Sequence, residues 1–65
     1  MTTADSVLIS IVLTKAEAWD LAQFLKRVGF SDFRINAQDD PEAYNMQDAA
    51  GKVRRALAEA GYAPR

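Results

Sequence analysis

The stretch Ser6-Val7-Leu8-Ile9-Ser10-Ile11-Val12-Leu13 decides the fold class of this chain. Apolar side chains occupy every odd position from 7 to 13, and positions 8, 10 and 12 alternate with them on the other face. Alternation with many β-branched residues is typical of a strand. We therefore predict an α+β fold with one N-terminal strand over residues 6–13. A lone strand leaves its edges unpaired, so we expect it to pair with the connector, with the N-terminal residues or with a strand from another chain.

A helix over about residues 15–28 is predicted directly after this stretch. Thr14 and Glu17 have the spacing of a capping box, in which each side chain accepts a hydrogen bond from a free backbone amide at the helix start. Gly29 is the expected left-handed stop. The helical period predicts a buried stripe, with Phe24 at its margin, made of Ala18, Leu21, Ala22, Leu25 and Val28.

A second main helix is predicted over about residues 41–60. Asp40 suits the N-cap, Pro41 suits the first helical position and Glu42 interacts favourably with the helix dipole. Gly61 is the expected stop. The buried stripe of this helix is predicted to consist of Ala43, Met46, Ala50, Val53, Leu57 and Ala60.

The connector between the two helices allows two interpretations. Ser31 can cap a short helix, or Phe33 and Ile35 can alternate as a short strand. We favour the helical turn. In both forms, Phe30, Phe33 and Ile35 are expected to be the buried apolar side chains of the connector.

Length and composition place the chain among small single domains. It has 65 residues, of which 49% are apolar, so we expect one domain over residues 1–65 with flexible residues 1–5. The chain contains no cysteine, which fits a reducing compartment and leaves no thiol for a disulfide. The apolar run at residues 7–13 is too short to cross a membrane, and no export signal is expected. We therefore predict a cytoplasmic protein without membrane contact.

Most enzyme chemistry lacks its usual residues here. The sequence has neither histidine nor cysteine, which excludes Ser-His and Cys-His catalysis and metal sites built from those ligands. Its three glycines are far apart, so no phosphate-binding loop is expected. The group Asp39, Asp40 and Glu42 lacks the ligand spacing of a calcium loop. We predict a non-enzymatic protein with no catalytic residue, cofactor or metal.

Charge is distributed unevenly, although the formal net charge is only −1. Residues 31–51 carry five carboxylates against a single arginine, and residues 52–65 carry four basic side chains against one glutamate. An acidic segment of this kind can present a partial imitation of a row of phosphates to a positively charged protein. It also argues against direct nucleic-acid binding. The predicted acidic contact residues are Asp32, Asp39, Asp40, Glu42 and Asp48.

Two aromatic residues fall outside the predicted buried stripes. Trp19 has polar neighbours on its helical wheel, and Tyr44 falls beside Asp48 and Gly51. Either another part of the chain covers these rings or they anchor an interface, where tryptophan and tyrosine are enriched. Gly51 is unfavourable within a helix and is compatible with the close approach of another backbone, with a kink or with neutral drift. We include Trp19 and Tyr44 among the predicted partner-binding residues.

One resemblance bears on the partner. The short, acidic, cysteine-free and helix-rich chain, with its stretch Phe24-Leu25-Lys26-Arg27-Val28-Gly29-Phe30-Ser31-Asp32, resembles small proteins of phages and mobile elements. Among these it is similar in character to anti-CRISPR proteins directed at type I systems, a group without a shared motif. The resemblance implies an inhibitor that acts in the cytoplasm of a host bacterium, binds a nucleic-acid-binding Cas subunit and blocks target DNA.

Two alternatives remain open from the sequence. One strand followed by two helices resembles the ribbon-helix-helix DNA-binding dimers. That family reads DNA with polar or basic strand residues, whereas the candidates here are Leu8, Ser10 and Val12. An antitoxin-like regulatory subunit would use the same kind of exposed face. The chain is accordingly expected to be a monomer or a strand-paired homodimer.

Overall fold

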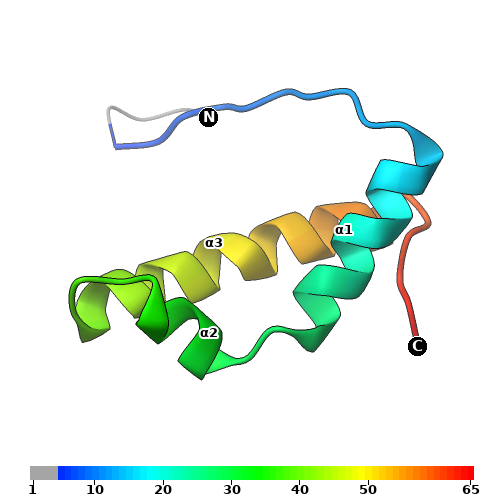
Figure 1. Cartoon of the computed structure of the whole chain (residues 1–65). Coiled ribbons are helices and arrows are strands. Elements are labelled where there is room, and N and C mark those ends of the chain that lie inside the picture. Colours follow the sequence, from blue (N-terminus) through cyan, green and yellow to red (C-terminus); the bar gives the residue numbers. More distant parts are fainter. Residues whose placement is uncertain (1–4) are drawn as a thin grey trace.

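A computed structural model of the protein describes residues 5–65 and contains three helices within them. These are α1 (Lys15–Arg27), α2 (Phe30–Ile35) and α3 (Asp40–Glu59), and α1 and α2 each pack against α3 (Figure 1). The described part of the chain contains no strand. The predicted α+β fold class is therefore wrong, and the described fold is all-helical. The predicted flexibility of residues 1–4 falls outside the described residues.

Residues 6–13 form an extended arm, called the arm from here on, in place of the predicted N-terminal strand (Figure 1). Their sequence has the propensity of a strand, but a strand exists only when a second extended segment supplies hydrogen-bond partners. The connector, which was one expected partner, is helical. Within residues 5–65, the backbone of residues 7–13 makes no hydrogen bond. The prediction failed because pairing depends on a partner that this local sequence cannot provide.

The start of α1 confirms the predicted capping box, whereas its end differs from the prediction. The N–H of Glu17 donates to Oγ1 of Thr14 at 3.0 Å, and the N–H of Thr14 donates to Oε1 of Glu17 at 2.8 Å. Gly29 does not adopt the left-handed conformation expected of a helix stop. Its φ is −115°, and it is the N-cap of α2. Gly61 is the glycine with positive φ in the described chain.

The connector forms the favoured helical turn, α2, although its cap differs from the predicted one. Gly29, and not Ser31, is the N-cap, and its N–H donates to Oδ2 of Asp32 at 2.8 Å. The connector was also expected to bury three apolar side chains. Phe30 and Phe33 are half-buried, but Ile35 is exposed, so this expectation is wrong for Ile35.

The long helix α3 begins one residue earlier than predicted and ends as predicted. Its N-cap is Asp39, which moves Asp40 to the first helical position and Pro41 to the second. At the other end Gly61 has φ 102°. The N–H of Gly61 donates to the Ala58 carbonyl at 3.0 Å and the N–H of Tyr62 to the Leu57 carbonyl at 2.8 Å. This pair of bonds is the Schellman motif, which needs a left-handed residue and explains the glycine.

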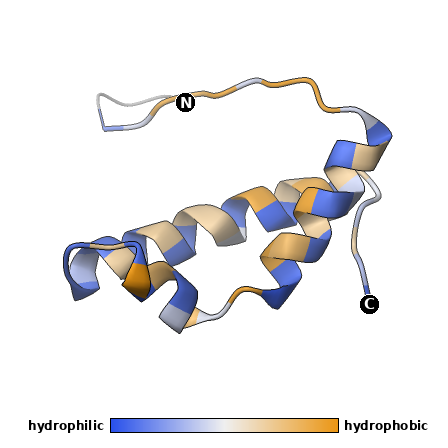
Figure 2. Ribbon diagram, viewed as in Figure 1, coloured by the Kyte–Doolittle hydropathy of each residue, from blue (hydrophilic) through white to orange (hydrophobic). Residues whose placement is uncertain are grey.

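The buried interior is small and consists mostly of alanine. Ala18 and Ala22 of α1 meet Leu57 of α3, and half-buried side chains pack around them: Leu13, Leu21, Leu25 and Tyr62. Ala43 is the other fully buried apolar residue in the described chain. The predicted stripe of α3 is correct at Ala43 and Leu57 but wrong at Val53, which remains 43% exposed, and at Ala60, which is also exposed. Orange segments in Figure 2 show that much apolar sequence lies on the arm, outside this interior.

Candidate functional site

The predicted acidic contact residues lie on two helices that pack against each other, α2 and α3. Asp32 lies on α2, Asp39 is the N-cap of α3, and Asp40 and Glu42 lie in its first turn. The two helices pack against each other, and Arg34 of α2 is paired with Asp40 of α3. We call these four residues the acidic corner. Asp48 lies further along α3, four residues after Tyr44 and on the same side of the helix.

Hydrogen bonds hold three carboxylates of the acidic corner in place. Asp32 accepts from the Gly29 amide, as described above. Oδ1 of Asp39 accepts from the N–H of Glu42 at 3.0 Å, and Oε1 of Glu42 accepts from the N–H of Gln38 at 2.7 Å. These are capping interactions that satisfy free amides at helix starts. They also give each carboxylate a defined position on the surface.

Arg34 connects the fourth carboxylate to the loop. Its Nε donates to Oδ1 of Asp40 at 2.6 Å, and its Nη1 donates to the Ala37 carbonyl at 3.1 Å. This is the one ion pair found within residues 5–65. Asp32, Asp39 and Glu42 therefore keep uncompensated charge. The first turn of each helix also concentrates the positive end of the helix dipole, which stabilises those charges without removing them from the surface.

An aromatic pair borders the acidic corner. The rings of Phe30 and Tyr44 lie 4.9 Å apart between centroids at an angle of 35°. Tyr44 is thus partly covered by the connector, but 56% of it stays exposed. Next to the pair is an open hollow of about 460 Å³, lined by Phe30, Ser31, Arg34, Ile35 and Ala37. Exposed apolar atoms and fixed charges are therefore adjacent on this surface.

Sequence reasoning missed Phe30, Arg34 and Ile35 as members of this surface. Arg34 was seen only as the single base of an acidic segment. Ile35 was assigned to the interior, although it lies at the last position of a six-residue helix. Placing Phe30 and Phe33 three residues apart on an inner face would have left Ile35 on another face of a helix. The helical spacing of the connector therefore predicts that Ile35 lies outside the interior.

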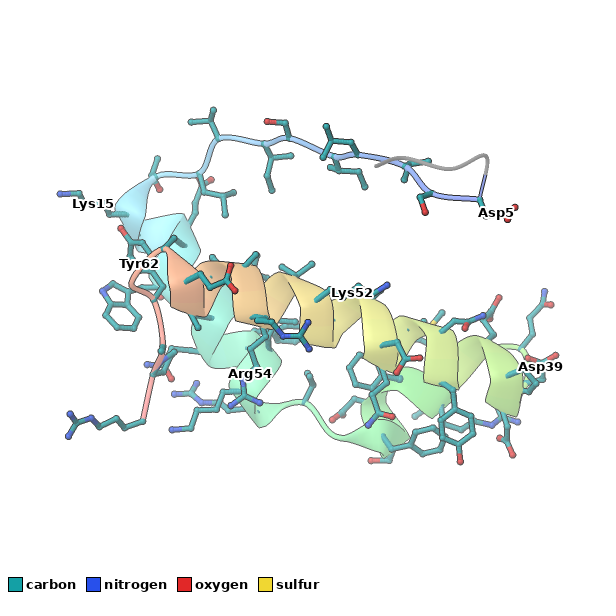
Figure 3. The ribbon with its side chains drawn as sticks, turned by 180° about the vertical axis from the view of Figure 1, so that it is seen from behind. Asp5, Lys15, Asp39, Lys52, Arg54 and Tyr62 are labelled. Carbon is teal, nitrogen blue, oxygen red and sulfur yellow. The ribbon has the colours of Figure 1, made fainter. Side chains whose placement is uncertain are left out.

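Trp19 does not belong to this surface. It lies on α1, and its ring meets Tyr62 edge to face, with centroids 5.3 Å apart and planes at 82°. Tyr62 and Asp39 lie at opposite ends of the molecule (Figure 3). The C-terminal segment thus covers one side of the indole, which is still 44% exposed. The structure separates Trp19 from Tyr44, which the sequence had grouped as partner-binding residues.

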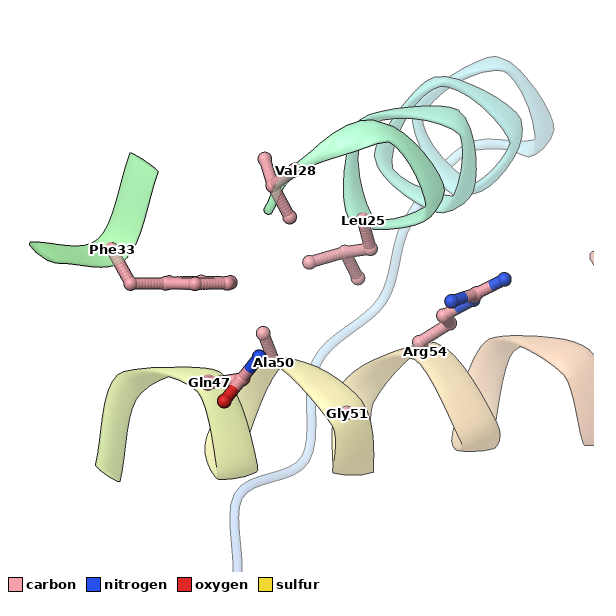
Figure 4. A pocket seen from close by; sticks show the side chains of 7 residues that line it. All are labelled: Leu25, Val28, Phe33, Gln47, Ala50, Gly51 and Arg54. Carbon is pink, nitrogen blue, oxygen red and sulfur yellow. The ribbon is translucent and has the colours of Figure 1, made fainter. Parts of the chain in front are cut away.

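A small pocket of about 140 Å³ lies where α1 and α2 diverge over α3. Leu25, Val28 and Phe33 point toward Ala50 and Gly51 of α3, and Arg54 lies at one side (Figure 4). A methyl group added at Gly51 would meet no atom within 4 Å outside its own helix, so no other segment of residues 5–65 approaches it closely. Gln47 and Arg54 add polar groups to the apolar lining, which contains no carboxylate. It offers no acid or base for catalysis.

Within residues 5–65, no group of three or more aspartate or glutamate side chains is placed to hold a metal ion. No helix in the described chain is long and apolar enough to cross a membrane. What the acidic corner can do chemically is to present oriented negative charge and an aromatic ring.

Comparison with known protein families gives a match over the whole chain. The model of a family described as "Family of unknown function (DUF7706)" matches residues 1–65. No curated protein and no solved structure matches the chain.

Proposed function

The chain belongs to DUF7706, a family of unknown function, and we propose that it acts without catalysis, by binding a positively charged protein at the acidic corner. One observation carries the proposal. Four carboxylates from two helix starts are held at defined positions on the surface beside the exposed ring of Tyr44.

The fixed positions favour binding because less conformational freedom is lost when the partner arrives. Immobilising a flexible side chain at an interface costs about 0.5–1.5 kcal/mol. Asp32, Asp39 and Glu42 are already ordered by backbone amides, so a basic partner gains their attraction with a smaller loss of entropy. Their charge also speeds encounter with a basic surface.

The aromatic pair supports binding in a different way. Charge alone gives steering and specificity, whereas buried aromatic and aliphatic side chains contribute most of the affinity at interfaces. Tyr44 and Ile35 are exposed next to the charges, and the hollow between Phe30 and Ile35 can accept an apolar side chain of the partner.

The partner that the sequence resemblance implies is a nucleic-acid-binding subunit of a type I CRISPR effector. In this form of the proposal the chain works in the bacterial cytoplasm, and the acidic corner occupies a surface that otherwise holds target DNA. Asp48 would extend the negative face along α3 beyond Tyr44. Direct binding of nucleic acid by this face is opposed by its charge.

The general proposal is tested by a titration with oligolysine, followed residue by residue with amide NMR shifts. We expect the perturbed residues to lie between 30 and 48. The variant Asp39→Asn/Glu42→Gln removes two charges while keeping a capping oxygen at each position, and should bind several-fold more weakly. The matched control Asp20→Asn/Glu59→Gln has the same net charge and should bind like the unmodified chain. Equal losses in the two variants would show that only total charge matters and would refute the site.

The specific form is tested against a purified type I effector complex. We expect the chain to bind the complex and to reduce its binding of target DNA, and Asp39→Asn/Glu42→Gln to do so less effectively than the control variant. Oligolysine binding at the corner without any effect on the effector would reject this partner and keep the general proposal.

A further inference from the structure

The arm contains most of the highly exposed apolar side chains of the described chain. Five of its residues, Val7, Leu8, Ile9, Ile11 and Val12, are between 65% and 98% exposed. Only Leu13, at its end, packs onto the buried cluster of α1 and α3. Contiguous apolar surface of this kind on a small protein marks an interaction site.

The backbone of the arm is exposed in the same way. Residues 7–13 make no backbone hydrogen bond within the described chain, and they are extended (Figure 3). An occupant that buries the arm must also pair these amides and carbonyls, because a buried unpaired backbone group is costly. The backbone groups of the helices are already hydrogen-bonded within each helix, so they cannot pair with the arm. The occupant must therefore offer an extended backbone.

The chain exposes more surface to solvent than a compact monomer of its mass does. The chain exposes 5505 Å², whereas a compact monomer of 7.2 kDa exposes about 4,100 Å². Residues 1–4, counted as fully extended chain, account for at most about 600 Å² of that total. Residues 5–65 then expose about 950 Å² more surface than a compact chain of their mass, by the same scaling.

We propose that a second copy of the chain covers the arm, and that the two arms pair antiparallel across a two-fold axis. The second copy brings an extended backbone with the same alternation, so each arm satisfies the other. Two copies together hold about 1,900 Å² of excess surface, and stable specific interfaces bury about 1,200–2,000 Å². A two-fold contact of this kind is closed, so it does not continue into a filament.

Continuity with the interior supports the same arrangement. Val7, Ile9 and Ile11 lie on the same face of the arm as Leu13, because side chains alternate in an extended segment. Leu13 already touches the buried cluster, so this face leads directly into it. In the dimer, the alternate positions from 7 to 13 extend the small alanine-rich interior. This inference uses no residue of the acidic corner and is independent of the proposed function.

The test measures mass in solution by sedimentation equilibrium over a range of concentrations. We expect a species of twice the chain mass. Ile9→Lys places a charge in the proposed contact and should weaken dimerisation by at least about tenfold. Ile35→Lys is the matched control, since Ile35 is also highly exposed but lies outside the arm, and it should leave the dimer intact. A monomeric unmodified chain, or equal weakening by both variants, would overturn the proposal.

Cross-linking tests the geometry without a destabilising change. The chain has no cysteine, so the variants Leu8→Cys, Ile9→Cys, Ser10→Cys, Ile11→Cys and Val12→Cys each introduce a single thiol along the arm. Antiparallel pairing about a two-fold axis brings one residue opposite its own copy, so one variant of the series should oxidise to a covalent dimer much faster than the others. Equal rates in all five variants, or none in any, would refute antiparallel pairing of the arms.

Discussion

Arg34 of α2 and Asp40 of α3 form an ion pair with 2.6 Å between Nε and Oδ1, and the same guanidinium donates to the Ala37 carbonyl. One side chain therefore joins the short helix, the loop and the long helix. The side chains of Arg34 and Asp40 are 44% and 68% exposed, which limits what the pair contributes to stability.

Replacing Arg34 tests this limit. We expect Arg34→Ala to lower the free energy of unfolding by about 0.5–1 kcal/mol, since exposed ion pairs contribute little and the Ala37 bond adds to the loss. Urea unfolding measures the change, and Arg55→Ala on α3 serves as control with a smaller expected effect. A loss above about 2 kcal/mol would contradict the view of a weak surface pair.

The capping box of α1 is tested at Thr14. Thr14→Ala removes the oxygen that accepts from Glu17 and should cost about 1 kcal/mol of stability. Thr14→Ser keeps the oxygen and should cost far less. Urea unfolding followed by far-ultraviolet circular dichroism checks both variants, and equal costs would show that the hydroxyl does not cap the helix.

Two glycines should respond to alanine with opposite signs. Gly61→Ala forces a side chain into φ 102° and should destabilise the protein by about 1 kcal/mol or more. Gly51→Ala adds a methyl group to open space within a helix and should stabilise it by about 0.5–1 kcal/mol. Thermal unfolding measures both. Destabilisation by Gly51→Ala would mean that another molecule packs against position 51 and leaves no room for the methyl group.

The contact between Trp19 and Tyr62 can be followed directly, because Trp19 is the single tryptophan of the chain. Tyr62→Leu removes the edge-to-face contact, which is worth about 0.5–1.5 kcal/mol beyond area burial. We expect lower stability and tryptophan emission at longer wavelength, as more water reaches the indole. Tyr44→Leu, at the other end of the molecule, should leave the emission unchanged. A shift in that control would contradict the separation of the two aromatic sites.

Local sequence predicted the helices well and the acidic corner in part. The Thr14–Glu17 box and the Gly61 stop were found because each depends on residues within a few positions of one another. The N-cap of α3 was displaced by one residue, since Asp39 and Asp40 both suit that role. The sequence groups the acidic residues with Tyr44 because most of them lie in one short segment at the start of a helix.

What the sequence could not determine depends on contacts between distant segments. Trp19 lies apart from Tyr44 because it packs on Tyr62, and Ile35 lies outside because α2 turns Phe33 inward.

By itself, the sequence determined the two long helices and their caps, since helical hydrogen bonds join residues four apart and need no other segment. Tertiary structure alone decided that residues 6–13 form an arm and not a strand, because a strand requires hydrogen bonds from a second extended chain. Within residues 5–65, no second segment donates or accepts a backbone hydrogen bond with residues 7–13.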